Sequence, residues 1–373
     1  MPKQDTDPDL SQNTVLDRSA ERQSTHPNAK QQAGDQPQKS TSKSSQAKSK
    51  HAKPKQSKSS APNRKASLLD RLRAAPLYVL PHHLISRIVF KMTRSRFMKN
   101  QLISGFIKLY KVDMAEAVET DPHAYPTFNA FFTRQLKPGA RAITPRVEHV
   151  ASPVDGTVSE FGAIDDGTLV QAKGRDYTLL ELLGGDNNSA IRYLNGSFIT
   201  IYLSPRDYHR VHMPLPGKLI SQTHVPGRLF SVAPHTVRAV KNVFARNERL
   251  VCQFENMFGG MTMVMVGAIN VAAIETVWDG LVTPPAGRQI LNVDYTSRKS
   301  ILLAKGDEMG RFNMGSTVIL LFDKPVSWHK QLAPGKTLRM GQPLALMSRK
   351  QARAPTASPN NSSTPDVIHM GQS

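Results

Sequence analysis

The chain has 373 residues, of which 39% are hydrophobic, and its 49 lysines and arginines against 29 acidic residues give a formal net charge of +20. That excess favours a polyanionic partner, either nucleic acid or an anionic membrane surface. A single cysteine, Cys252, excludes an internal disulfide and fits a reducing compartment. The sequence has no secretory signal pattern and no run of about 18 apolar residues, so any membrane contact is expected to be peripheral.

Both ends of the sequence have the composition of disordered tails. Residues 1–66 are rich in Gln, Ser, Lys and Pro, and they contain no aromatic residue and almost no branched aliphatic one. Such a segment buries too little apolar surface to offset its ordering entropy. Residues 351–373 are similar. We interpret the basic N-terminal tail chiefly as solvated chain, with weak attraction to anionic lipid as the alternative.

Residues 67–140 form the predicted helical region. Apolar residues recur there at helical spacing with Lys and Arg between them, and breaks are expected at Pro81 and at 93–95. Apolar stripes flanked by cations suit helices that lie in a membrane interface, and they equally suit helices packed on a core with basic outer faces. The two stripes are Leu84, Ile85, Ile88 and Val89, and then Leu102, Ile103, Phe106, Ile107 and Tyr110.

From residue 141 to residue 350 the pattern changes to short β-like runs separated by Gly and Pro turns. Helical patterns are few there, near 177–183 and 234–243. We therefore expect an α+β fold with a β-rich, mostly antiparallel core, an N-terminal helical region and two disordered tails. The expected strands include 198–203, 261–266, 271–277, 301–304 and 317–322.

Two polar segments of the predicted core bring an aspartate and two histidines. The turn at 152–158 has Asp155 at its tip, and a later segment has His209 and His212 three residues apart. Taken singly, these patterns are more typical of an ordinary turn and of surface histidines. A zinc site is disfavoured, because the histidines lack an obvious third ligand and the one cysteine stands alone, so no metal is expected.

A third segment has Ser316 directly after Gly315 and before a predicted strand. By itself that pattern is typical of a bulge or a turn. Together with Asp155 and a histidine, however, the serine completes the set that activates a hydroxyl nucleophile. A serine hydrolase is one candidate, although Ser316 does not lie in G-x-S-x-G and a strand follows it where a nucleophile elbow needs a helix. The nearest carbonyl that it could attack is that of Gly315, which no side chain shields.

As a set, these motifs closely resemble the phosphatidylserine decarboxylase family. The Leu-Gly-Ser-Thr processing motif of that family appears as MGST at 314–317, in which methionine conserves the volume of leucine. The histidine motif matches DYHRVHMP at 207–214, and the aspartate motif matches SPVDG at 152–156. The resemblance runs from residue 70 to residue 347 and leaves out only the two tails. Further similar segments are 110–114, 127–132, 225–232, 266–271 and 305–312.

The resemblance implies a chain that cuts itself. Ser316 would attack the carbonyl of Gly315 and convert the peptide bond to an ester. His212 would be the general base that takes the hydroxyl proton, and Asp155 would orient that histidine and stabilise its charged form. These four residues are thus the implied cleavage site and self-processing triad.

The resemblance also implies the cofactor and the reaction. Elimination of the ester would separate a β chain, residues 1–315, from an α chain, residues 316–373, and would leave dehydroalanine at position 316. Hydrolysis of that group would release ammonia and leave a covalent pyruvoyl group derived from Ser316. That group would form a Schiff base with the amine of phosphatidylserine and act as an electron sink for loss of CO₂, which gives phosphatidylethanolamine. His209 would serve the decarboxylation step, in proton transfer.

The implied partners are an anionic phospholipid membrane, the lipid substrate, and a second αβ unit in a homodimer. The helices of 67–140 would dock peripherally on the cytoplasmic face of the cell membrane, which would account for the positive charge. Nucleic acid is disfavoured, because aromatic residues are only 6% of the chain and no nucleic-acid-binding motif is present. The rival hypotheses are an uncut serine hydrolase that uses the same triad, and a non-enzymatic basic module.

Overall fold

The structure is a computed structural model that describes residues 66–172, 175–269, 273–283, 289–297, 300–313 and 317–348. These residues all belong to one unit of the chain, Ser57–Ser373. The tails predicted at 1–66 and 351–373 lie outside the described residues, apart from Ala66. No helix in the described part of the chain is long and apolar enough to span a membrane.

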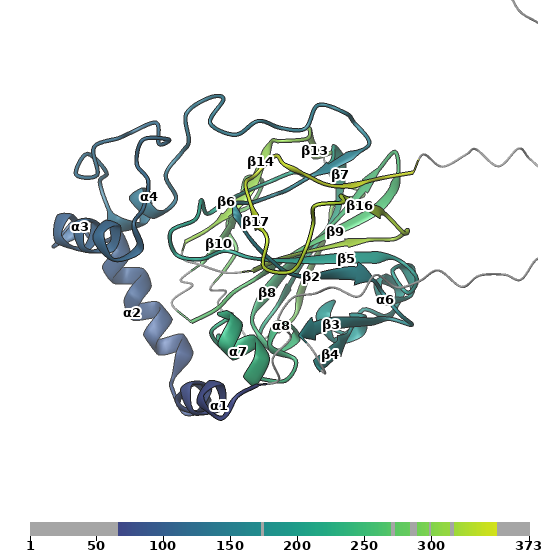
Figure 1. Ribbon diagram of the computed structural model, residues 1–373, viewed down its shortest axis with the longest axis horizontal. Coiled ribbons are helices and arrows are strands. Elements are labelled where there is room, and N and C mark those ends of the chain that lie inside the picture. Colours follow the sequence, from purple (N-terminus) through teal and green to yellow (C-terminus); the bar gives the residue numbers. More distant parts are fainter. Residues whose placement is uncertain are drawn as a thin grey trace, which may run out of the picture. The chain divides into compact units, whose positions relative to one another are not determined.

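The N-terminal region is helical, as the apolar periodicity predicts (Figure 1). Its elements are α1 (Leu68–Ala74), a 3-10 helix (Ala75–Tyr78), α2 (His82–Arg94), α3 (Lys99–Tyr110) and α4 (Phe128–Phe132). Helix α1 begins with a capping box, in which the side chains of Ser67 and Asp70 each accept from the other's backbone amide. Helix α2 begins directly after Pro81 and ends at Arg94, so both predicted breaks are confirmed.

The apolar stripe of α3 is a core contact. Ile103 is fully buried, and Phe106 packs edge-on against Phe128 and Phe132 of α4. Such aromatic contacts add to the burial of apolar area. Helices α3 and α4 therefore form a small core of their own.

Helix α2 differs from α3 in the side chains that it buries. The side chains that it buries are polar, namely His82, Ser86 and Thr93. Two residues of its predicted apolar stripe, Leu84 and Ile88, are 58% and 51% exposed. The helix thus turns much of its apolar surface away from the protein.

The largest sheet among the described residues has nine strands, and all its pairings are antiparallel. From one edge to the other these strands are β12 (Leu291–Asp294), β7 (Gly217–Val225), β8 (Arg249–Asn256), β9 (Gly259–Val266), β15 (Thr317–Phe322), β5 (Ser197–Tyr202), β2 (Gly156–Ala163) and β17 (Thr337–Leu338), with β13 (Leu302–Leu303) also on β7. All six residues of β15 are buried. The predicted strands at 198–203, 261–266, 301–304 and 317–322 are confirmed as β5, β9, β13 and β15.

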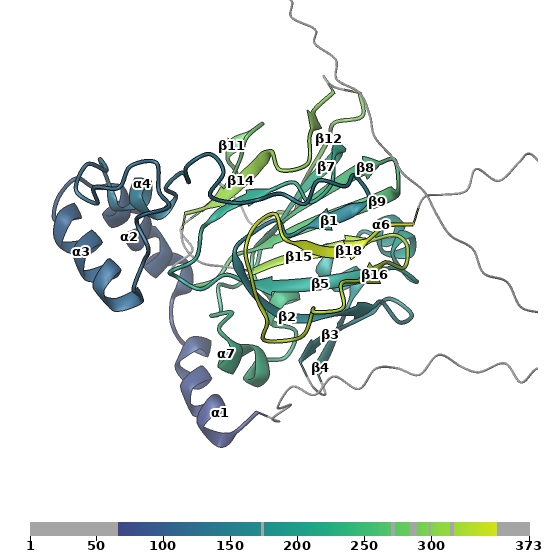
Figure 2. The same ribbon diagram turned by 45° about the horizontal axis from the view of Figure 1, so that its top comes forward.

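Smaller sheets and short helices complete the fold (Figure 2). A four-stranded sheet contains β11 (Gly280–Leu281), β10 (Ile274–Thr276), β14 (Glu308–Phe312) and β6 (Arg210–His212). A three-stranded sheet contains β1 (His149–Ala151), β18 (Pro343–Leu346) and β16 (Ser327–Trp328). A separate hairpin contains β3 (Thr168–Ala172) and β4 (Arg175–Thr178). The remaining helices are α5 (Leu179–Leu182), α6 (Asn187–Arg192), α7 (Pro234–Ala239) and α8 (Val243–Arg246). The predicted α+β class with a mostly antiparallel core is confirmed.

Two features of this topology position the candidate site. Strand β14 pairs with β6, so the histidine segment lies beside the strand that leads toward the predicted cleavage site. Strand β14 ends at Phe312 in the four-stranded sheet, and β15 begins at Thr317 in the centre of the large sheet. Between these two residues the chain passes from one sheet to the other.

Candidate active site

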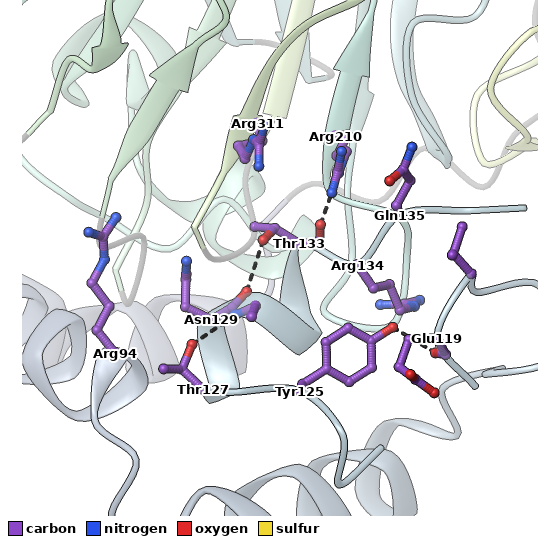
Figure 3. Close-up of a pocket in the computed structure, with 12 residues that line it drawn as sticks. Arg94, Glu119, Tyr125, Thr127, Asn129, Thr133, Arg134, Gln135, Arg210 and Arg311 are labelled. Carbon is purple, nitrogen blue, oxygen red and sulfur yellow. Dashed lines mark hydrogen bonds between the residues drawn. The ribbon is translucent and has the colours of Figure 1, made fainter. Parts of the chain in front are cut away.

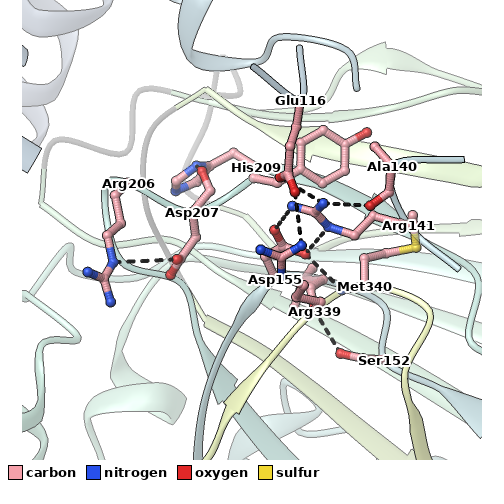
Figure 4. A network of polar contacts seen from close by, with 12 residues as sticks. Glu116, Ala140, Arg141, Ser152, Asp155, Arg206, Asp207, His209, Arg339 and Met340 are labelled. Atoms are coloured by element: carbon pink, nitrogen blue, oxygen red, sulfur yellow. Dashed lines mark hydrogen bonds and ion pairs between the residues drawn. The ribbon is translucent and has the colours of Figure 1, made fainter. Parts of the chain in front are cut away.

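Asp155 lies in the loop between β1 and β2, where it is buried against an arginine (Figure 4). Arg141 donates from Nε to Oδ1 at 2.9 Å and from Nη2 to Oδ2 at 2.5 Å, and the amide of Met340 donates to Oδ1 at 2.7 Å. Arg141 also pairs with Glu116 at 2.8 Å, and Glu116 pairs with Arg339 at 2.9 Å. The aspartate is therefore fixed at the end of a chain of alternating charges.

His212 is the last residue of β6, and both of its ring nitrogens have hydrogen-bond partners. Nδ1 lies 2.8 Å from the carbonyl oxygen of Gly306, and because a carbonyl only accepts, Nδ1 carries the proton. Nε2 therefore accepts from the hydroxyl of Tyr208 at 3.0 Å, and the two rings stack. Burial lowers the pKa of His212. The ring is thus neutral, and its unprotonated nitrogen, Nε2, is covered by the hydroxyl of Tyr208.

The aspartate and this histidine are neighbours without a direct bond. The amide of His212 donates to the carbonyl of Pro153 at 2.9 Å, which brings β6 beside the loop of Asp155. In the described part of the chain, no hydrogen bond or ion pair joins the Asp155 carboxylate to the His212 ring, and the carbonyl of Gly306 orients the ring instead. The orienting role of Asp155 therefore stays a prediction.

His209 is fully buried at the start of the same segment. Its Nδ1 donates to the carbonyl of Asp207 at 2.8 Å, and its ring packs on Phe132 with the ring centres 4.1 Å apart. Nε2 has no hydrogen-bond partner among the described residues. Burial, with help from the charge of Arg134, lowers the pKa of His209 to about 3. His209 is therefore a neutral ring with one open acceptor nitrogen.

The predicted cleavage site, Gly315-Ser316, lies outside the described residues, but both of its flanks are anchored. Before it, the amide nitrogen Nδ2 of Asn313 donates to Glu275 at 2.7 Å, and the Asn313 carbonyl Oδ1 accepts from Asn129 at 3.0 Å. After it, Thr317 is buried and begins the central strand β15. The described residues on both sides of the predicted cleavage site thus have defined contacts.

A cavity of about 200 Å³ opens beside the start of β15. Its lining includes Tyr202, which pairs with Thr317 across the sheet, and Ala268, two residues beyond the other partner of Thr317, Val266. Phe132, the residue that packs on His209, also lines it. The rest of the lining comes from Phe106, Tyr110, Leu203, Pro205, Ser231, Val232, Ala233 and Ile269. The cavity is mostly apolar and lies next to the buried histidine.

Sequence reasoning assigned no role to Arg141 or Tyr208. Tyr208 lies inside the histidine motif, directly before His209, and that position was the available signal. Arg141 precedes Asp155 by 14 residues in an irregular segment, and no local pattern links the two. Among the described residues, no group of three or more His, Cys, Asp or Glu is placed to hold a metal ion.

Comparisons with known proteins agree with this arrangement of motifs. A family model described as phosphatidylserine decarboxylase matches residues 128–346, and another, described as PSD, matches residues 72–111. Similar proteins named phosphatidylserine decarboxylase proenzyme include one from Alkalilimnicola ehrlichii, 54% identical over 73% of this chain and 93% of its own length. A Bordetella pertussis relative is 51% identical over 74% of this chain and 95% of its own length. A Shewanella frigidimarina relative is 49% identical over 76% of this chain and 100% of its own length. The chain therefore belongs to the phosphatidylserine decarboxylase family.

Proposed function

We propose that this chain is a proenzyme that cuts itself between Gly315 and Ser316 and then decarboxylates phosphatidylserine to phosphatidylethanolamine. The observation that carries the proposal is that both flanks of the cleavage site have defined contacts. Asn313 follows β14, which pairs with the strand that ends in His212, and Thr317 begins the buried strand β15. Because the nucleophile and its target are adjacent in the chain, the attack has less entropy to lose than one between separate groups.

In the first step, His212 takes the proton of the Ser316 hydroxyl. The oxygen attacks the carbonyl carbon of Gly315, so a C–O bond forms as the C–N bond breaks, and the product is an ester. The neutral ring supports this role, because burial keeps His212 unprotonated. The nearby charge of Asp155 favours the protonated ring that forms during the step. Elimination then releases the β chain with a carboxylate on Gly315.

The residues around the start of β15 fit a small covalent ketone derived from Ser316. The hydroxyl of Thr317 and Nε2 of His209 are buried and have no hydrogen-bond partner among the described residues, so each is available to a group formed there. A pyruvoyl group at Ser316 would supply the electron sink that loss of CO₂ from an amino acid requires. His209 would move a proton at Nε2 during that step.

The cavity beside β15 is the proposed substrate site. Its position next to His209 suits the serine head group, and its apolar wall from α3, Phe106 and Tyr110, suits the lipid part. The lining also includes Ser231 and Val232, which belong to a segment that the family resemblance singles out. Substrate thus would enter from the side of the N-terminal helices.

Those helices are the proposed membrane-docking surface. Exposed apolar side chains are numerous on these helices and on the connections between them, and Lys and Arg lie among them in the sequence to meet lipid phosphates. We infer peripheral attachment to the cytoplasmic face of the cell membrane, and the homodimer of αβ units stays a prediction. The exposed apolar residues are Leu68, Leu69, Leu72, Tyr78, Val79, Leu80, Leu84, Ile88, Met92, Phe97, Met98 and Leu109.

The test is turnover of vesicles that contain phosphatidylserine. The purified protein should release CO₂ and form phosphatidylethanolamine, whereas Ser316→Ala should remain a single chain and release none. Activity in the uncut Ser316→Ala protein would refute the proposal. Labelling of Ser316 in an uncut chain by a fluorophosphonate would favour the serine hydrolase instead.

A further inference from the structure

A second and larger cavity, of about 640 Å³, lies against a different face of α4 (Figure 3). Asn129, Ala130 and Thr133 contribute to its wall, whereas Phe132 lines the smaller cavity beside β15. Neither candidate catalytic histidine is among its lining residues. The larger cavity is therefore a separate feature, which the proposed reaction does not use.

The lining of this cavity is strongly basic. Arg94 comes from the end of α2, Arg134 follows α4, Arg210 comes from β6, and Arg311 comes from β14. Figure 3 shows these four side chains around the cavity, with Arg134 beside the ring of a tyrosine. Among the described residues, the only carboxylate that lines the cavity is that of Glu119. Four elements that are distant in sequence thus bring guanidinium groups to one hollow.

Three of the four arginines already have acidic partners. Arg94 pairs with Glu275 at 2.8 Å, and Arg210 pairs with Glu308 at 2.8 Å. Arg311 lies between the same two carboxylates, 3.0 Å from Glu308 and 3.8 Å from Glu275. These pairs keep the three arginines in place and compensate part of their charge.

Arg134 has no such partner. The residue is 5% exposed, and its Nε has no hydrogen-bond partner among the described residues. In the described part of the chain, its side chain donates one long hydrogen bond, 3.4 Å from Nη2 to the carbonyl of Arg206. A buried cation without an ion-pair partner is unfavourable, and burial accordingly lowers the pKa of Arg134. The site therefore holds a positive charge that an anion would compensate.

We propose that this cavity is an anion-binding site for a phosphate group, with Arg134 as its anchor. A guanidinium presents parallel N–H donors that match two phosphate oxygens, and the neighbouring arginines add positive potential. The volume leaves room for a substituent on the phosphate. Free phosphate and the phosphodiester of a lipid head group share this chemistry. A lipid source is compatible with the docking proposal, because the helix that supplies Arg94, α2, also carries exposed apolar side chains that would face the membrane.

The test is binding to the purified, processed enzyme, with inorganic phosphate and glycerophosphoglycerol as probes. The second probe is the head group of an anionic phospholipid without its acyl chains. Thermal unfolding is followed at rising probe concentration, with sodium chloride at matched ionic strength as the reference. At least one probe should raise the Tm of the wild type in a saturable way. Arg134→Met should weaken that binding by about tenfold or more, because it removes a charged donor. Arg192→Gln, an arginine outside the cavity that pairs with Glu255 and Asp323, should bind as the wild type does.

The two probes distinguish the sources. Saturation by inorganic phosphate identifies free phosphate, and saturation by glycerophosphoglycerol alone identifies the head group. If Arg134→Met does not fold, Arg94→Gln decides, because Arg94 lies at the exposed rim and its loss should still weaken binding several-fold. Equal stabilisation by chloride, or unchanged binding in the variant that folds, would overturn the proposal. The assay reads binding alone, so its result does not depend on turnover of lipid.

Discussion

The hydroxyl of Tyr208 donates a 3.0 Å hydrogen bond to Nε2 of His212, the nitrogen that a general base needs for its proton. The carbonyl of Gly306 holds the proton on the opposite nitrogen. A donor bonded to the neutral ring opposes protonation and adds to the effect of burial on the pKa of His212. The tyrosine thus favours the neutral ring but also covers it. If His212 is the base, as we propose, the tyrosine would have to turn aside or relay the proton when Ser316 is activated.

Tyr208→Phe should therefore shift the pH dependence of self-cleavage. Without the donor, the pKa of His212 rises, and the neutral base forms only at higher pH. The rising limb of cleavage rate against pH should move upward by as much as about one pH unit. The measurement is the fraction of precursor cleaved with time, using protein made by cell-free translation and then adjusted to each pH. Tyr78→Phe, at an exposed tyrosine, is the control. A profile identical to the wild type would mean that the hydrogen bond does not tune the base.

The pair formed by Arg141 and Asp155 predicts a strong stability effect. Arg141→Met leaves a buried carboxylate without its cation, which should lower the free energy of unfolding by about 3–5 kcal/mol. Adding Asp155→Asn should restore part of this loss, since the stranded charge is gone. Denaturant unfolding in a Ser316→Ala background keeps every variant uncut and comparable. Strictly additive effects of the two changes would contradict the pairing.

The same change at the aspartate should separate stability from chemistry. In the chain with Ser316 present, Asp155→Asn should leave the precursor largely uncut, even when Arg141→Met accompanies it. Gel analysis of freshly made precursor measures this directly. Normal cleavage in Asp155→Asn would show that the carboxylate serves only the fold.

Removal of each of the two histidines should impair a different step. His212→Ala should leave the chain largely uncut, because the base is missing. His209→Ala should permit at least some cleavage but reduce turnover of phosphatidylserine by about 100-fold or more. Chain lengths on a gel and CO₂ release per cleaved chain measure the two steps separately. Full turnover in His209→Ala would make that residue structural, and normal cleavage in His212→Ala would refute the base assignment.

The exposed face of α2 should control vesicle binding. Leu84→Asp with Ile88→Asp replaces two outward apolar side chains, each worth about 1.5–3 kcal/mol when buried. Affinity for anionic vesicles should fall by at least about tenfold, while turnover of a short-chain, water-soluble phosphatidylserine should stay near that of the wild type. Met257→Asp, at an exposed apolar residue outside the helices, is the control. Equal vesicle affinity in the double variant and the control would contradict docking through α2.

The parts of the fold that the sequence predicts are those with a strong local signal. Strand β15 is a continuous apolar run, and its six residues are all buried as such a run requires. The breaks around α2 follow from Pro81 and the polar residues near 95. Asp155 and the histidines were found because each lies in a motif of adjacent residues.

The parts that the sequence does not predict depend on tertiary structure. Periodicity marks the stripes of α2 and α3 alike, but it does not tell which one faces the protein, and α3 packs inward while α2 exposes Leu84 and Ile88. The bond from Arg141 to Asp155 and the covering of His212 by Tyr208 are set by how loops and strands meet. The burial of Arg134 could not be predicted either, because an arginine that follows a helix is ordinarily solvated.

The most direct test of self-processing is the intact mass of the purified protein under denaturing conditions. The account predicts two species: residues 1–315, and residues 316–373 lighter by one ammonia than the peptide that begins with Ser316, as a pyruvoyl end requires. A single full-length mass from a preparation that decarboxylates phosphatidylserine would contradict the account.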